Sequence, residues 1–312
     1  MTALVFQELP HPGLIRFSGE EAQAFLHNQL SCDVAALTLG RSTYGAYCTP
    51  KGRVFASFLL WRSEQGLFMQ LPSSLREPIQ QQLSKFILRS KVKAENLPDD
   101  PALIGVAGDD AAARLQKVLG AAPTAPHDVV HVAGATIIRL PVDRYQIAVP
   151  REQAPRLAEA LGAADQAGPE HWEWLAIRAG IPVILPATQE QFVPQMVNLD
   201  LIGGVSFQKG CYPGQEIVAR MHYRGTLKQR MVLANIAVAE RPQPGDKLYS
   251  PSFSVQASGA IVNAARSPDS GYDVLAVVQI ASAERGDIHW KSLDGPVLKL
   301  LPLPYQVSRD RQ

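Results

Sequence analysis

One short segment of the chain combines a cysteine with residue types that could activate it. Cys211 follows Lys209 by two positions and precedes the predicted start of a helix, at Pro213 or Gly214, by two or three. The positive end of a helix dipole and a neighbouring cation both favour the thiolate form of cysteine. The pattern therefore indicates a functional thiol at Cys211. The competing interpretation is a buried structural cysteine, the common state of a free thiol.

The other candidate metal-binding and nucleophilic residues lack such surroundings. Cys32 and Cys48 lie in apolar sequence, so we interpret them as packing residues. The cysteines form no C-x-x-C pair, which argues against a disulfide framework and against a zinc or iron–sulfur site made by this chain alone. His127 and His131 fall on a predicted strand, where four residues span about 13 Å. No metal site is predicted.

A nucleophilic role for Cys211 would require a base. His222 is the nearest candidate in the sequence, and the alternative for it is a capping or packing role. The sequence contains no G-x-G-x-x-G, Walker, G-x-S-x-G or H-E-x-x-H motif, which removes the usual indications of nucleotide, serine-hydrolase and zinc-protease chemistry.

The elements that must position Cys211 begin with an alternation of strands and helices in the first hundred residues. The pattern predicts strands at 14–17, 43–48, 54–61 and 66–71. A capping box at Ser18 and Glu21 begins one helix, and a second helix is predicted over 75–88. The apolar side of that second helix is expected to comprise Leu75, Ile79, Leu83, Phe86 and Ile87.

The rest of the chain divides into a similar α+β part and a β-rich part. The second part has predicted strands at 102–106 and in a hairpin over 129–147, and helices over 109–119, 151–161 and 172–179. From Met231 onward short strands and turns without a helical period predict a small β-barrel. The expected fold class is α+β, with two ferredoxin-like domains, 1–100 and 101–227, and a barrel domain, 228–312.

Composition and charge narrow the function classes. Apolar residues make up 46% of the 312 residues, which excludes a disordered chain. The net charge is only +1, but segments 51–62, 85–93 and 201–230 carry +3, +4 and +4. If they converge they form a site for a small polyanion, and otherwise they are solvated surface. Direct recognition of RNA is not favoured, because aromatic residues make up only 7%.

No targeting or membrane segment is predicted. The start of the chain lacks a basic region before its first apolar stretch, and the longest charge-free run, 248–265, contains Pro251, Gly259 and four serines. Together with the cysteine usage, this predicts a soluble cytoplasmic protein.

Residues 209–216 read Lys-Gly-Cys-Tyr-Pro-Gly-Gln-Glu and resemble the K-G-C-[FY]-x-G-Q-E signature of the YgfZ family. These are folate-binding proteins with the fold of the glycine-cleavage T-protein. The resemblance extends over essentially the whole chain and is weakest in the C-terminal barrel. Further segments similar to that family are 51–53, 88–92, 174–182, 192–195 and 198–200.

The resemblance implies a fold, a cofactor and a partner class. It implies a ring-like T-protein architecture of two α+β domains and a barrel around a central folate cavity. It also implies tetrahydrofolate or a one-carbon derivative as cofactor. Iron–sulfur proteins, including enzymes that modify tRNA, are the implied clients for assembly or repair. Cys211 matches the functional cysteine of the family.

A folate needs an apolar or aromatic slot for its pterin, polar groups for the pterin edge and cations for its glutamate tail. We expect stacking by Trp174 and Tyr212, and hydrogen bonds to the edge from Glu190 and Gln215. The cations expected to bind the folate are Lys51, Arg53, Lys91, Arg178 and Lys209. The alternative for each of these residues is ordinary packing or solvation.

One departure from the related aminomethyltransferases affects the function. Those enzymes carry a G-x-V-x-D-D pattern whose acids serve the folate chemistry, whereas this chain has Ala56 and Ser57 at the corresponding places. Neither residue supplies a carboxylate to orient or deprotonate an amine. We therefore favour an accessory factor, and the alternative is a folate-dependent one-carbon transferase that uses the Cys211 thiol.

Overall fold

The computed structural model describes residues 4–6, 9, 12–98, 100–162, 168–253 and 256–307 of the chain. The chain forms two compact units. The first comprises Met1–Gln29, Asp33–Tyr44 and Phe58–Trp172, and the second comprises Leu30–Cys32, Gly45–Ser57 and Glu173–Gln312. The division of the sequence into domains at residues 100 and 227 remains a prediction.

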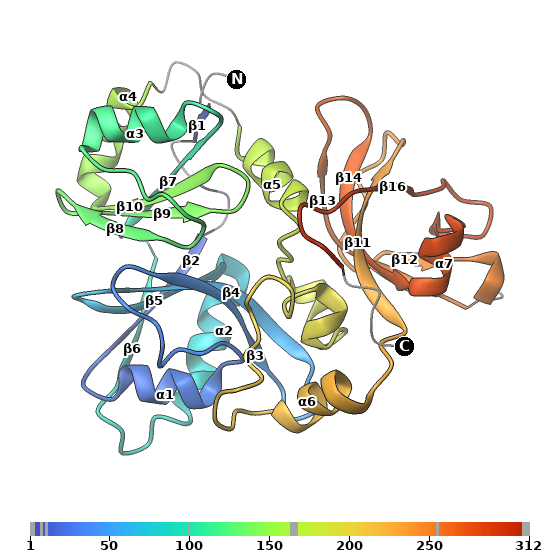
Figure 1. Ribbon diagram of the computed structural model, residues 1–312, viewed down its shortest axis with the longest axis horizontal. Helices are drawn as coiled ribbons and strands as arrows, with labels where there is room; N and C mark the ends of the chain where they lie inside the picture. Colours follow the sequence, from blue (N-terminus) through green and yellow to red (C-terminus); the bar gives the residue numbers. More distant parts are fainter. Residues whose placement is uncertain are drawn as a thin grey trace. The chain divides into compact units, whose positions relative to one another are not determined.

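The first five-stranded sheet contains β2 (Pro12–Ser18), β3 (Ser42–Cys48), β4 (Val54–Ser63), β5 (Gly66–Pro72) and β6 (Lys93–Leu97) (Figure 1). Its strands lie in the order β3-β4-β5-β2-β6, and the pairs β4–β5, β5–β2 and β2–β6 are antiparallel. Two helices accompany it, α1 (Ala22–Gln29) and α2 (Ser73–Ser84). α2 contacts β2, β5 and β6.

The end of α2 differs from the sequence-based expectation. Leu75, Ile79 and Leu83 are buried as predicted, but the helix ends at Ser84 rather than at position 88. The N–H of Phe86 donates to the carbonyl of Leu83, an i→i+3 bond that tightens the last turn. The apolar pattern continued past the end of the helix, so periodicity alone extended it too far.

The second five-stranded sheet contains β1 (Leu4–Phe6), β7 (Ala102–Ala107), β8 (Val129–Val132), β9 (Ala135–Leu140) and β10 (Arg144–Val149). Its order is β1-β7-β10-β9-β8, with antiparallel neighbours throughout. The predicted β8–β9 hairpin is present. Its turn residues, Ala133 and Gly134, both have positive φ, as a two-residue hairpin turn requires.

Two helices cover this second sheet. They are α3 (Ala111–Leu119) and α4 (Ala154–Ala160), the latter preceded by the 3-10 turn η1 (Arg151–Gln153). Leu115 of α3 and Ala158 of α4 are fully buried against apolar residues of β7, β9 and β10. The amphipathic helices predicted in these regions are therefore present.

The C-terminal part forms a six-stranded antiparallel half-barrel in the order β15-β12-β13-β14-β11-β16. Its strands are β11 (Gln229–Ile236), β12 (Lys247–Tyr249), β13 (Gly259–Arg266), β14 (Tyr272–Gln279), β15 (His289–Trp290) and β16 (Lys299–Leu301). A short 3-10 turn, η5 (Pro251–Phe253), and one helix, α7 (Ile280–Arg285), accompany them. The prediction of strands and turns alone was therefore wrong at α7.

Alternate residues of the half-barrel strands belong to two different cores. Leu275 and Val277 of β14 pack in one core, whereas Val274 and Ala276 pack in the other. Both faces of the sheet are therefore buried, as the period of two along a strand allows. The α+β class with antiparallel sheets and a C-terminal barrel-like sheet, predicted from the sequence, is confirmed.

The chain between the sheets supplies the remaining elements of the second unit. These are α5 (Pro169–Arg178), η3 (Pro186–Thr188), η4 (Pro194–Val197) and α6 (Gln215–Arg224). Ile177 of α5 and Val218 of α6 share one core with Cys48, Val54 and the half-barrel. That core fixes the segment before α6, which contains Cys211. Within the described ranges, no helix has the length and apolar character needed to cross a membrane.

Candidate functional site

The segment that carries Cys211 is anchored at its start by Lys209. The Lys209 ammonium donates a hydrogen bond to the carbonyl oxygen of Leu30 at 2.5 Å and lies 5.0 Å from the centre of the Tyr212 ring. A second link lies a little earlier in the chain, where the Ser206 N–H donates to the Ser31 carbonyl at 2.9 Å. The ammonium of Lys209 thus holds the loop that presents Cys211.

The C-terminal end of the Cys211 segment is fixed by a close contact between two glycines, Gly214 and Gly52. Gly214, the N-cap of α6, has a φ of 82°, and a Cβ there would lie 2.4 Å from the Thr49 carbonyl oxygen. Gly52 has a φ of 70°, and a Cβ there would lie 2.8 Å from the Cβ of Ile217. Both the backbone conformation and the lack of space require glycine. The turn after β3 and the start of α6 are therefore packed directly together.

A third segment pairs with the start of β4. The Glu190 N–H donates to the Val54 carbonyl at 2.9 Å, and the Val54 N–H donates to the Phe192 carbonyl at 2.8 Å. The Arg53 guanidinium donates to the Gln191 carbonyl at 2.8 Å. Glu190 has a φ of 59°, a strained conformation for a residue with a side chain, and that side chain is exposed. The surrounding backbone bonds hold an acid in place at the surface.

These three segments bring together most of the residues predicted from the sequence, and we call them the Cys211 cluster. Its members are Lys51, Arg53, Glu190, Lys209, Cys211, Tyr212 and Gln215. The exposed Lys51 ammonium and Glu190 carboxylate have no hydrogen-bond or ion-pair partner within the part of the chain that the structure describes. They are the charged groups of the cluster that a ligand could engage.

The three cysteines fall into two classes. Cys211 is exposed, whereas Cys32 and Cys48 are buried. Burial raises the pKa of the Cys48 thiol to about 12, so that thiol stays protonated at neutral pH. Burial also raises the pKa of the Tyr212 phenol, with the Cys48 and Cys32 groups adding to the shift. The packing role predicted for Cys32 and Cys48 is therefore confirmed, and the buried-thiol alternative for Cys211 is excluded.

Trp174 and Arg178 form a separate group on α5. The Trp174 Nε1–H donates to a carboxylate oxygen of Asp273 at 2.8 Å, and the Arg178 guanidinium lies 3.5 Å from the same oxygen. The guanidinium also lies 6.0 Å from the Trp174 ring centre. Asp273 is only 2% exposed, so this carboxylate joins α5 to β14. Both predicted folate residues are thus half-buried and already hydrogen-bonded or paired.

Lys91 lies in the first unit, unlike the other predicted site residues. Its ammonium forms an ion pair of 2.7 Å with Glu20, and both side chains are mostly exposed. The structure therefore gives Lys91 a local acidic partner within the first unit.

The two positions at which the sequence comparison expected acids to be missing, Ala56 and Ser57, are buried and carry no charge. Ser57 Oγ donates to the Pro182 carbonyl at 3.0 Å and accepts a hydrogen bond from the Ile184 N–H at 3.0 Å. Ala56 is fully buried. The Ser57 hydroxyl is therefore used in tying β4 to the segment that follows α5.

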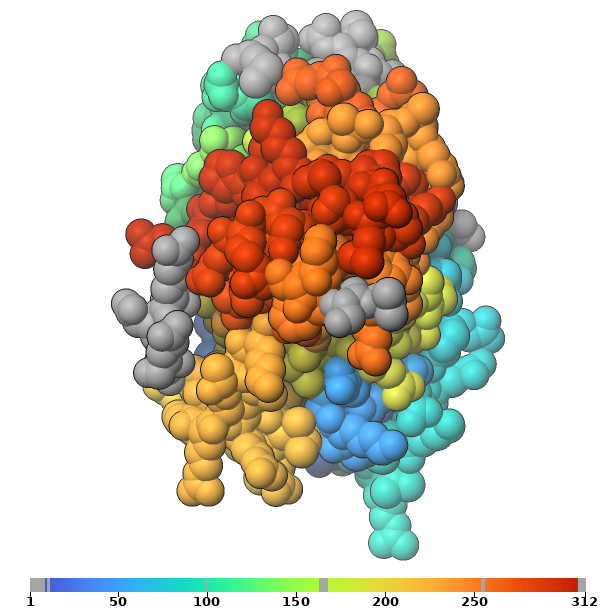
Figure 2. All heavy atoms as spheres, turned by 90° about the vertical axis from the view of Figure 1, so that its right-hand side faces the viewer, coloured from blue at the N-terminus to red at the C-terminus, as the bar shows by residue number. Residues whose placement is uncertain are grey.

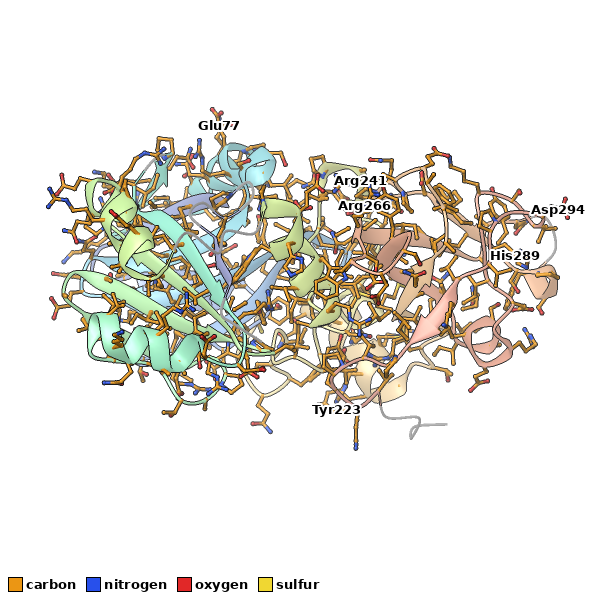
Figure 3. All side chains as sticks on the ribbon, turned by 90° about the horizontal axis from the view of Figure 1, so that it is seen from above. Glu77, Tyr223, Arg241, Arg266, His289 and Asp294 are labelled. Atoms are coloured by element: carbon orange, nitrogen blue, oxygen red, sulfur yellow. The ribbon has the colours of Figure 1, made fainter. Side chains whose placement is uncertain are left out.

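His222 packs between aromatic rings. It stacks on Phe207 with ring centres 3.7 Å apart, and Tyr223 meets it edge to face. Tyr223 is 63% exposed and points outward from α6 (Figure 3). This arrangement agrees with the packing alternative for His222.

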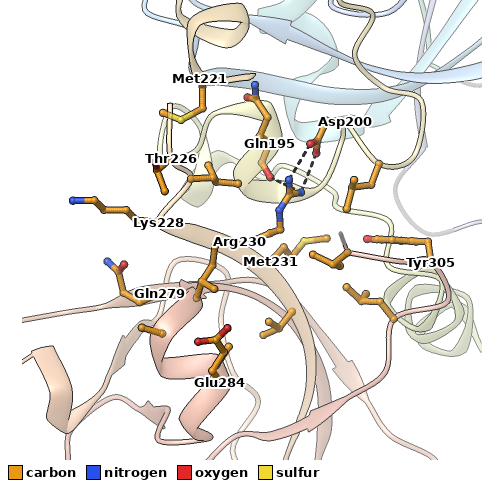
Figure 4. Close-up of a pocket in the computed structure, with 18 of the residues that line it drawn as sticks. Gln195, Asp200, Met221, Thr226, Lys228, Arg230, Met231, Gln279, Glu284 and Tyr305 are labelled. Atoms are coloured by element: carbon orange, nitrogen blue, oxygen red, sulfur yellow. Dashed lines mark hydrogen bonds and ion pairs between the residues drawn. The ribbon is translucent and has the colours of Figure 1, made fainter. Parts of the chain in front are cut away.

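A cavity of about 990 Å³ lies in the second unit (Figure 4). Its wall includes His222, the exposed Lys228 and the ion pair between Arg230 and Asp200, whose closest atoms are 3.0 Å apart. None of the residues predicted to bind folate lines it. Within the described residues, no group of three or more His, Cys, Asp or Glu side chains could hold a metal ion.

The roles of two residues near the predicted site were not predicted from the sequence. Asp273 anchors Trp174 and Arg178, and its signal was a single acid at the start of an apolar strand. Leu30 receives the Lys209 hydrogen bond from 179 positions away, and no local pattern could have indicated that pairing.

Comparisons with known proteins agree with this fold and motif. Residues 3–170 match the family described as GCVT N-terminal domain. The chain is 32% identical over 310 residues to the "tRNA-modifying protein YgfZ" of Escherichia coli O127:H6, covering 98% of this chain and 94% of that protein. It is 31% identical over 302 residues to the protein of the same name from Yersinia pestis strain Pestoides F, covering 96% and 91%.

A solved structure shares the fold. The glycine cleavage system aminomethyltransferase T from Bartonella henselae superimposes with a TM-score of 0.75 and 19% identity, covering 97% of this chain and 86% of that one. At that identity the likeness concerns the fold alone. On the sequence relationships, the chain belongs to the YgfZ family, within the fold of the glycine-cleavage T-protein.

Proposed function

We propose that the protein is a tetrahydrofolate-binding accessory factor in the assembly or repair of iron–sulfur proteins, including enzymes that modify tRNA. Cys211 is its functional thiol, and iron–sulfur client or assembly proteins are its partners. The observation that carries the proposal is the contrast among the cysteines: only Cys211 is exposed, and the loop that presents it is held by Lys209 and Gly214.

The residues of the Cys211 cluster fit a folate in chemical type. The amino and N–H groups of a pterin are donors that a carboxylate can accept, and Glu190 offers an exposed carboxylate without a partner among the described residues. The tail carboxylates of a folate need a cation, which Lys51 offers at the same cluster. When bound, tetrahydrofolate supplies a carrier of one-carbon units.

The remaining candidates fit less directly. Trp174 and Arg178 would bind a folate only in addition to their contacts with Asp273. Tyr212 is only 6% exposed, so we assign it the support of the Cys211 loop under Lys209. Arg53 and Gln215 already donate to backbone carbonyl oxygens, and we give them a positioning role as well.

We do not propose aminomethyl transfer. That reaction needs a carboxylate to orient the amine, and the corresponding positions hold Ala56 and a Ser57 whose hydroxyl is engaged with Pro182 and Ile184. Direct binding of RNA is likewise not part of the proposal. The alternative is a folate-dependent one-carbon transfer that uses the Cys211 thiol.

Titration with tetrahydrofolate tests the folate part of the proposal. We expect saturable quenching of tryptophan fluorescence and a matching heat in calorimetry. The Lys51→Glu variant should weaken binding by roughly twofold to fivefold, the range for a solvent-exposed ion pair. The Lys117→Glu variant, which reverses an exposed cation on α3, should bind normally. Absence of both quenching and heat in the unmodified protein would exclude folate binding.

A further inference from the structure

The loop that follows α2 presents apolar side chains to solvent. Residues 85–91, which we call the 85–91 loop, belong to the first unit, and Figure 2 shows this turquoise segment standing out from the surface. Leu88 is 87% exposed and Phe86 is 46% exposed. A shallow hollow lies against them, lined by Glu21, Phe86, Ile87, Leu88, Arg89 and Ser90. Exposed apolar side chains that lie together, rather than scattered singly, can mark an interaction site.

Hydrogen bonds tie the 85–91 loop to the start of α1 and close it on itself. The Lys91 N–H donates to the Glu21 carboxylate at 2.6 Å, and the Lys91 ammonium donates to Glu20 at 2.7 Å. The Ser90 N–H donates to the Ile87 carbonyl at 2.8 Å. The exposed apolar groups are thus preorganised, which reduces the entropy that a partner must remove on binding.

The backbone itself turns Leu88 outward. Leu88 has a φ of 46°, in the left-handed region that residues with a side chain rarely adopt. At the base of the loop, Gly19 lies so close to it that a Cβ would be 2.1 Å from the Lys91 carbonyl oxygen. Both the backbone strain at Leu88 and the exposure of its side chain to water are unfavourable in free energy. Strained residues of this kind are concentrated at functional positions.

The cations around the loop divide into those with a carboxylate partner and those without one. Lys91 and Lys93 are neutralised by Glu20 and Glu95 at 2.7 and 2.6 Å. Lys85 and Arg89, which bracket the exposed residues, have no carboxylate partner among the residues that the structure describes. Lys85 donates only to an amide oxygen of Gln82. The loop therefore presents apolar groups between two unneutralised cations.

We propose that the 85–91 loop is a docking site for a partner protein whose surface has an apolar recess bordered by carboxylates. Leu88 enters the recess, and Lys85 and Arg89 meet the acids at its rim. RNA is not favoured as the occupant, because Phe86 is the one aromatic ring of the loop and the most exposed apolar residue, Leu88, cannot stack on a base. A lipid surface does not fit either, because two side chains bury far less apolar area than a membrane-binding helix or acyl chain. The proposal concerns the first unit and does not rest on the folate function.

Site-specific photocrosslinking of the full-length protein in its host cells can identify the occupant. A benzoylphenylalanine placed at position 88 should crosslink to a distinct protein, and mass spectrometry should place the link in an apolar surface site with neighbouring acids. The matched control position is Val142, another exposed apolar residue with positive φ in the same unit. Crosslinks at position 142 should not include that protein.

Binding of the purified partner then tests the chemistry. Leu88→Asp should weaken the affinity by roughly tenfold or more, as expected for a central apolar contact. Arg89→Glu should chiefly slow association and reduce its dependence on salt, as expected for a rim charge. Val142→Asp should leave affinity unchanged, and circular dichroism confirms that each variant is folded.

Several outcomes would overturn the proposal. Crosslinks from position 88 mainly to tRNA would show that the loop binds nucleic acid, and Leu88-dependent binding to vesicles of phosphatidylcholine and phosphatidylglycerol would show that it binds lipid. The proposal is also wrong if positions 88 and 142 give the same crosslinks. Equal affinities of Leu88→Asp and unmodified protein for the crosslinked partner would contradict it directly.

Discussion

Cys211 and Cys48 belong to the same compact unit, yet their surroundings are opposite. Tyr212 follows Cys211 in the sequence, and the Cys48 group adds to the rise in the pKa of the Tyr212 phenol. Cys48 is 1% exposed in an apolar core, and burial raises its pKa to about 12, whereas Cys211 stands at the surface. The comparison shows that a single unit can bury one thiol for packing and present another for chemistry.

The largest effect is expected from a side chain added at Gly214, where the start of α6 packs against the turn that follows Cys48. Gly214→Ala should destabilise the protein by about 2–4 kcal/mol, because it adds left-handed strain to a clash with the Thr49 carbonyl, 2.4 Å from the new Cβ. Unfolding in urea measures the loss. Gly203→Ala is the matched control, since Gly203 has a φ of 78° but no atom within 4 Å of its Cβ position. It should cost only about 1–2 kcal/mol. Equal losses would mean that the contact at Gly214 is not tight.

Alkylation rates test the exposure of the thiols themselves. Iodoacetamide should modify Cys211 in the native protein, while Cys32 and Cys48 should react only in urea, because they are buried. Their native rates should be slower by on the order of a hundredfold or more, since reaction requires local opening. Peptide mapping by mass spectrometry assigns each label. Rapid labelling of Cys48 in the native protein would show that this thiol is not buried, and would contradict the contrast with Cys211.

The dependence of stability on alkaline pH gives a smaller effect. The Cys48 pKa is raised from 9.0 to about 12, so above pH 9 the unfolded chain releases a proton that the folded chain retains. Stability should therefore fall as pH rises through this window, by at most about 1.4 kcal/mol per pH unit. The Cys48→Ala variant should show a shallower fall than the unmodified protein. An unchanged slope would show that the Cys48 thiol does not titrate in this way.

Local patterns predicted much of the fold and one part of the site. Period-two alternation and turn residues predicted the strands, as at the β8–β9 hairpin with Gly134. The end of α2 was missed, because Phe86 and Ile87 continue the apolar spacing although the helix ends at Ser84 and Phe86 is exposed. Local periodicity predicts how a residue could be buried but not whether a neighbour covers it.

The site shows the same limit. Cys211 and its loop could be identified because their signal is contained in eight consecutive residues. The task of Lys209 depends on the distant Leu30 carbonyl, and the hydrogen bonds of Trp174 depend on Asp273 of β14. Pairings between residues so far apart in the chain depend on the tertiary fold, so sequence spacing could not assign them.

The most direct test separates the thiol from the folate. In a host strain that lacks this protein, the unmodified protein and Cys48→Ser should restore the nucleosides made by iron–sulfur tRNA-modifying enzymes, measured by mass spectrometry of tRNA. Cys211→Ser should leave them at the empty-vector level while its purified form binds tetrahydrofolate with unchanged affinity. Full restoration by Cys211→Ser would contradict the account, because the exposed thiol would then be dispensable.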